Sequence, residues 1–170
     1  MKPWIVQCLL LGLMGCGAAA LPPQEPESTD ALQGQAVWIS DQGDHAAHVQ
    51  YLDKFNKINI LPSDPVAHYV YGAYTVSVPD VPEVVFRAQV EQSRVSSQAA
   101  VFQVYTQRGA EFVLLGQVLL DSSHESDQIE VDLSAYRGQD LLLILSVSAP
   151  TPDATLSAPV SWDNPQIVHP

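Results

Sequence analysis

The densest cluster of polar side chains lies between residues 41 and 48, where Asp41, Asp44, His45 and His48 occur in one short segment. A zinc site needs three or four converging ligands, and on a strand His45 and His48 point to opposite faces because they are three residues apart. Carboxylate oxygens are the ligands that calcium prefers, so Asp41 and Asp44 are the candidate metal ligands. A solvated turn is the favoured interpretation, with calcium at Asp41 and Asp44 and then zinc as the alternatives.

A second polar segment, residues 121–127, contains Ser122, His124 and Asp127, the residue types of a hydrolase triad. The G-x-S-x-G elbow that would mark a serine nucleophile is absent from the sequence. Phosphate-binding glycine loops, dinucleotide fingerprints and zinc-finger spacings are absent from it as well. We therefore expect a hydrophilic loop at this segment and a protein that is not an enzyme.

Tyrosines cluster between residues 67 and 78, a segment with the composition of a strand. Tyr69 and Tyr71 are two residues apart and share one face of that strand, whereas Tyr74 lies on the other. Packing within the sheet is the more common role of strand tyrosines, but exposed tyrosines can also stack on sugar rings. Tyr69 and Tyr71 are therefore candidate ligand-binding residues. Trp162 is a third candidate, with a structural role at the end of the fold as the favoured alternative.

The first twenty residues have the layout of a secretory signal, with Lys2 followed by a mostly apolar run over residues 3–13. The tetrapeptide Leu13-Met14-Gly15-Cys16 resembles the bacterial lipobox, in which a small residue precedes the cysteine. The resemblance implies a signal peptide over residues 1–15 and a mature lipoprotein whose Cys16 thiol carries diacylglycerol, so that fatty acyl chains such as palmitate anchor it. Cleavage after Ala18-Ala19-Ala20, which would release a soluble secreted protein, and an uncleaved membrane helix are the alternatives.

The cysteine count agrees with lipidation, because Cys8 and Cys16 are the only cysteines and no disulfide can form after residue 16. Acyl chains on Cys16 would anchor the protein in a membrane of the bacterial cell envelope. Gly17, which stands where a retention signal would have Asp, resembles the outer-membrane sorting signal of Gram-negative cells. Residues 16–33 are rich in proline and alanine and are expected to form a disordered tether.

The chain of 170 residues carries 19 acidic and 7 basic residues, a net charge of −12. No cluster of Lys or Arg supplies the positive surface that phosphate backbones require, so nucleic acid is excluded as a partner. An acidic surface does steer cationic proteins, which keeps an envelope protein open as a partner.

Residues 34–170 show the period-two alternation and the turn residues of short strands. Phe86, Ala88 and Val90 alternate with more polar neighbours, whereas residues 141–145 are apolar on both faces, as in a central strand covered on both sides. Further strands are expected over residues 35–41, 45–53, 67–78, 98–107, 111–120, 128–133 and 157–168. The pattern predicts an all-β domain, an antiparallel β-sandwich of jelly-roll type with about eight or nine strands.

The C-terminal third resembles galactose-binding-like jelly rolls, including the NPCBM modules of bacterial glycosidases. The resemblance rests on residues 131–139, the apolar strand 141–147 and the segment 160–167. Such modules bind carbohydrate and often hold a structural calcium, the one cofactor that the resemblance implies. We therefore expect a cell-envelope lipoprotein whose sandwich is a non-catalytic binding module for a glycan or another envelope component. The alternative is a protein-interaction or scaffold lipoprotein that docks on an envelope complex and binds no sugar.

Overall fold

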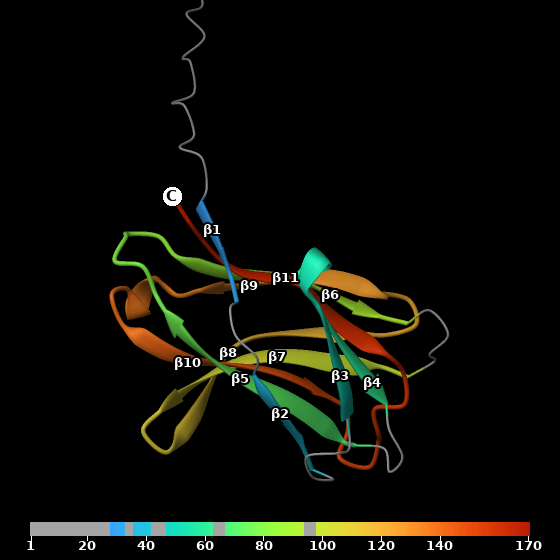
Figure 1. The fold of residues 1–170 in the computed structure, drawn as a ribbon. Helices are drawn as coiled ribbons and strands as arrows, with labels where there is room; N and C mark the ends of the chain where they lie inside the picture. Colours follow the sequence, from blue (N-terminus) through green and yellow to red (C-terminus); the bar gives the residue numbers. More distant parts are fainter. Residues whose placement is uncertain (1–27, 33–35, 42–46, 63–66, 94–97) are drawn as a thin grey trace, which may run out of the picture.

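The structure, a computed structural model, is an antiparallel β-sandwich whose two sheets lie face to face (Figure 1). It describes residues 28–32, 36–41, 47–62, 67–93 and 98–170. The predicted all-β sandwich is confirmed, although the sheets contain eleven strands rather than eight or nine.

The six-stranded sheet has the order β3-β4-β11-β6-β9, with β1 also beside β11. Its strands are β1 (Ser28–Ala31), β3 (Ala47–Leu52), β4 (Lys57–Pro62), β6 (Val85–Gln92), β9 (Ser126–Asp132) and β11 (Val160–His169). The five-stranded sheet has the order β2-β5-β10-β7-β8. Its strands are β2 (Val37–Ser40), β5 (Tyr69–Ser77), β7 (Ala100–Arg108), β8 (Glu111–Leu120) and β10 (Asp140–Ser148). Two 3-10 helices, η1 (Asp53–Phe55) and η2 (Ser134–Tyr136), join β3 to β4 and β9 to β10.

Two strands, β1 and β4, lie outside the strands expected from the sequence. β4 (Lys57–Pro62) occupies the gap between the expected strands 45–53 and 67–78. β1 lies inside the predicted tether 16–33, which is therefore wrong for its last part: Ser28–Ala31 pairs with the C-terminal half of β11. Backbone hydrogen bonds hold this strand while Thr29, Asp30 and Ala31 stay exposed, so no apolar alternation marks it in the sequence. The predicted signal peptide and Cys16 lie outside the described residues. In the part of the chain that the structure describes, no helix has the length and apolar composition to cross a membrane.

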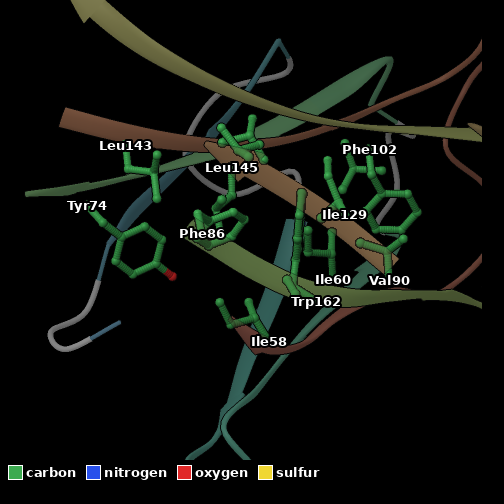
Figure 2. Packing of buried hydrophobic residues seen from close by; sticks show 14 of the residues in the cluster. Ile58, Ile60, Tyr74, Phe86, Val90, Phe102, Ile129, Leu143, Leu145 and Trp162 are labelled. Carbon is green, nitrogen blue, oxygen red and sulfur yellow. The ribbon is translucent and has the colours of Figure 1, made fainter. Parts of the chain in front are cut away.

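The core lies between the sheets and is filled by alternate residues of strands from both (Figure 2). The alternation predicted for β6 is confirmed, since Phe86, Ala88 and Val90 are all buried. Phe102 of the five-stranded sheet meets Trp162 of the six-stranded sheet edge to face, with ring centroids 5.2 Å apart and planes at 78°. Burying each such side chain contributes roughly 1.5–3 kcal/mol, so this aromatic contact is one of the main links between the sheets.

β10 is the middle strand of the five-stranded sheet, as its apolar composition predicts. Leu143 and Leu145 point into the core and are fully buried. Leu142 and Ile144 point to the opposite, outer face of the sheet. Among the described elements none packs on that outer face, so the expected cover on both sides is wrong. Side chains of the neighbouring strands shield Ile144 instead, and they form the surface described next.

Candidate ligand-binding surface

The outer face of the five-stranded sheet carries a hollow of about 390 Å³. Four adjacent strands, β5, β10, β7 and β8, supply its lining, which is mostly aromatic or apolar: Tyr69, Tyr71, Ile144, Ser146, Tyr105 and Phe112. Ligand sites in proteins are typically concave surfaces of this size, lined by apolar and aromatic groups with a few polar ones. The hollow is therefore the candidate binding site.

Strand pairing brings these side chains together from distant parts of the chain. Tyr71 of β5 lies opposite Ser146 of β10, and Ile144 of β10 lies opposite Tyr105 of β7. β8 follows β7 through a hairpin in which Gly109 has a φ of 63°, a left-handed conformation that glycine adopts without steric cost. Because paired residues of neighbouring strands point to the same face, the lining residues all reach the outer surface.

The residues that line the hollow differ in solvent exposure, so that some form its floor and others its rim. Ile144 and Ser146 form the floor, where 5% and 8% of their surface is exposed. Tyr69 and Phe112 form the rim, where 43% and 63% is exposed. Large aromatic groups that remain open to solvent around a buried apolar floor are characteristic of surfaces that contact a ligand or partner.

Tyr69 and Tyr71 form a stacked pair, with ring centroids 6.3 Å apart and planes inclined by 27°. Tyr74, in contrast, points into the core and is 4% exposed. The predicted division of the three tyrosines between the two faces of the strand is confirmed. The stacked rings offer apolar faces together with hydroxyl groups that can donate and accept hydrogen bonds. Ligand contact by Tyr69 and Tyr71 stays a prediction.

The inner side of β5 is held in place by aromatic contacts between the sheets. Gly72 leaves room for the indole ring of Trp38, which a Cβ atom at residue 72 would overlap. The Trp38 Nε1–H donates a hydrogen bond to the Tyr51 hydroxyl, which in turn donates to the carbonyl oxygen of Ala36 at 3.2 Å. These contacts connect β2 and β3 next to Tyr71, so the tyrosine pair rests on a well-packed strand.

Trp162 is wrong as a ligand-binding candidate. Its side chain is 0% exposed, because it lies on the same face as its cross-strand partners Ile58 and Val90, which are buried, and meets Phe102 in the core. Its indole Nε1–H has no hydrogen-bond partner among the described residues, so the side chain contributes through packing. Trp162 is a structural residue, which was the alternative that the sequence left open.

Asp41, one of the two candidate calcium ligands, is engaged with His68. Its Oδ1 atom accepts a hydrogen bond from the His68 backbone N–H at 3.0 Å, and Oδ2 lies 2.5 Å from His68 Nδ1. Burial alone would raise the pKa of the Asp41 carboxyl, but the hydrogen bonds from His68 outweigh burial and lower this pKa below its ordinary value. Asp44 and His45 lie outside the described residues. Within the described ranges no three His, Cys, Asp or Glu side chains gather as metal ligands.

The loop after β8 does not lie at the hollow. It crosses from β8 in one sheet to β9 in the other, and the Asp121 carboxylate accepts backbone hydrogen bonds from Ser123 at 2.8 Å and His124 at 3.0 Å. Those two hydrogen bonds form a compact polar turn. The Asp127 Oδ2 atom lies 3.7 Å from His124 Nε2, and both side chains are largely exposed. This arrangement agrees with the hydrophilic loop expected from the sequence.

Sequence reasoning missed four of the six lining residues: Tyr105, Phe112, Ile144 and Ser146. A signal for Tyr105 and Phe112 is present, since the strands that contain them have apolar residues on both faces. One such face must be exposed if the sheet is an outer layer of the sandwich. Deciding which strands lie side by side requires the strand order, which local alternation does not contain.

Together the fold and the hollow define a class of protein: a two-sheet β-sandwich module with an aromatic surface on one sheet. No protein-family model and no curated protein sequence matches the chain. Solved structures, however, match over most of its length.

One similar structure is the C-terminal CBM6 of LamC, a marine laminarinase from Zobellia galactanivorans. It has a TM-score of 0.50 and 8% identity, and the match covers 85% of this chain and 100% of that one. Another is TmCBM61 in complex with β-1,4-galactotriose, with a TM-score of 0.50, 9% identity, and 85% and 88% of the two chains covered. At such identities the likeness shows the fold, that of carbohydrate-binding modules. That the chain is not an enzyme stays a prediction.

Proposed function

We propose that this protein is a non-catalytic module that binds a glycan over the hollow on its five-stranded sheet. The observation that carries the proposal is the open aromatic lining, in which three tyrosines and a phenylalanine surround a buried floor. The C–H faces of pyranose rings are apolar and pack on aromatic ring faces, while their hydroxyls pair with a few polar groups. The names of the solved structures of the same fold give independent support.

The experiment that tests glycan binding is retention of the purified protein on a panel of immobilised polysaccharides, with and without calcium. We expect retention on at least one polysaccharide, competed by its soluble oligosaccharide. Circular dichroism of the same sample establishes that the protein is folded. A folded protein that no glycan retains would contradict the proposal and favour the alternative, a scaffold lipoprotein with a protein partner.

We also propose that the module is anchored in the bacterial cell envelope through Cys16. The support is the lipobox-like tetrapeptide Leu13-Met14-Gly15-Cys16, which places the cysteine 12 positions before the first residue of β1, Ser28. In a Gram-negative host, Gly17 favours the outer membrane over the inner one.

Lipidation predicts a specific mass and location. Intact-mass measurement is expected to show a chain that begins at Cys16 with a diacylglycerol attached, found in the membrane fraction. Cys16→Ala should leave an uncleaved precursor without lipid, and Cys8→Ala, the matched control, should behave as wild type. A soluble product cleaved after Ala20 would refute the anchor without bearing on glycan binding.

A further inference from the structure

The outer face of the five-stranded sheet bears no charge across its central rows. Along its described strands, every outward position between the strand ends is uncharged: Ile39, Tyr69, Tyr71, Ala73, Thr75, Val101, Gln103, Tyr105, Gln107, Phe112, Leu114, Gln117, Leu119, Leu142, Ile144, Ser146 and Ser148. Asp140, hydrogen-bonded by the Ser77 hydroxyl at 2.6 Å, stands at one end of this face. The outward side chains around the hollow are therefore uncharged.

The outer face of the six-stranded sheet has the opposite character. Lys57 Nζ lies 2.9 Å from Glu91 Oε2 and 2.8 Å from Asp163 Oδ2. Arg87 Nε lies 2.6 Å from Glu130 Oε1. The chain as a whole has a net charge of −12. The lack of charge on the five-stranded sheet is thus a property of that face and not of the composition.

A polar row crosses the uncharged face and leads into the hollow. Gln103 of β7 lies opposite Ser146, which is in the floor of the hollow, and on its other side lies opposite Gln117 of β8. Gln103 is half-buried and Gln117 is exposed. Within the described residues neither amide makes a side-chain hydrogen bond. Each amide has two hydrogen-bond donors and an acceptor, and it lies on the same face as the aromatic lining. Such amides can hydrogen-bond sugar hydroxyls, which both donate and accept.

We propose, on the basis of the glycan-binding function above, that the ligand is an uncharged glycan and that Gln103 and Gln117 are specificity residues that hydrogen-bond its hydroxyls. An anionic glycan, such as a uronate or sulfate polymer, would be repelled by the net negative charge of the protein. The described part of this face also has no outward Lys, Arg or His to pair with its anionic groups. Carboxylate and sulfate groups depend on such cations for charge-assisted hydrogen bonds. A neutral polymer is not repelled and needs no cationic partner. Its sugar rings can stack on the aromatic side chains, and its hydroxyls can hydrogen-bond the amides of Gln103 and Gln117.

The first test compares neutral polysaccharides with matched uronate or sulfated polysaccharides by titration calorimetry at low and at high salt. We expect the neutral polymer to bind with an affinity that salt changes by less than about twofold, because no ion pair forms. We expect the anionic polymer to bind at least about tenfold more weakly at low salt. Tight, salt-sensitive binding of the anionic polymer would overturn this inference but leave glycan binding intact. Failure of both kinds of polymer to bind would refute the proposed function itself.

The second test uses Gln103→Ala and Gln117→Ala with the neutral ligand. Each is expected to weaken binding about three- to tenfold, the effect of losing one or two hydrogen bonds with uncharged partners. Gln89→Ala is the matched control, because Gln89 is an exposed strand residue on the six-stranded sheet, and it should bind as wild type. Wild-type affinity in both variants at the five-stranded sheet would show that the amides do not contact the ligand.

Discussion

Tyr71→Ala is expected to weaken glycan binding by about thirtyfold or more. Tyr71 lines the hollow between Tyr69, whose ring centroid is 6.3 Å away, and Ser146, its partner across the sheet. Truncation removes the ring face that stacks on the ligand and opens the floor of the hollow to water. Aromatic residues at the centre of a binding surface typically contribute about 2 kcal/mol or more, and about 1.4 kcal/mol corresponds to a tenfold change in affinity.

The control for this variant is Phe55→Ala. Phe55 is 71% exposed, and it lies on η1 between two strands of the six-stranded sheet, away from the hollow. Calorimetric titration with the glycan that wild-type protein binds should give wild-type affinity for Phe55→Ala and a large loss for Tyr71→Ala. If both variants bind as wild type, the ligand does not use the tyrosine pair. Unfolding curves of both proteins exclude loss of fold as the cause.

Trp162→Ala is expected to lower the free energy of unfolding by about 3–5 kcal/mol. The indole is fully buried and makes an edge-to-face contact with Phe102 across the two sheets. Its removal leaves a cavity that the rigid sheets cannot close, and domains of this size have only about 5–15 kcal/mol of stability. Urea unfolding followed by circular dichroism measures the change.

Phe112→Ala is the comparison, since it removes an aromatic ring that is exposed at the surface and not buried in the core. Phe112 is 63% exposed at the rim of the hollow, so its truncation should change the free energy of unfolding by less than about 1 kcal/mol. Trp162→Ala should unfold at a clearly lower urea concentration than Phe112→Ala. Equal midpoints for the two variants would contradict the structural role of Trp162.

The contrast between Tyr71 and Trp162 shows how far aromatic residues can be interpreted from sequence. Alternation predicts that Tyr69 and Tyr71 share a face, since successive strand residues point to opposite sides. It also predicts the buried series in β6. Alternation does not tell which face is the core. Trp162 points inward because its partners across the sheet, Ile58 and Val90, lie on the face that the other sheet covers.

The metal expectation shows a related limit. Asp41 belongs to an acidic segment of the sequence, and local spacing suggested Asp44 as its partner. In the structure its carboxylate turns to His68, 27 residues further along, because the end of β2 lies next to the start of β5. A hydrogen-bonding partner at that separation is set by strand pairing, so spacing within one segment could not reveal it.

The sequence by itself determined the all-β class, the acidic charge, the lipobox-like tetrapeptide and the shared face of Tyr69 and Tyr71, because these depend on composition or on neighbours a few residues apart. The tertiary structure decided that Tyr105 and Phe112 join those tyrosines around Ile144 and Ser146. It also decided that Gln103 and Gln117 extend the surface and that Trp162 is excluded from it. The physical reason is the strand order β5-β10-β7-β8, in which backbone hydrogen bonds pair segments as many as 79 residues apart in register, as for Tyr69 and Ser148.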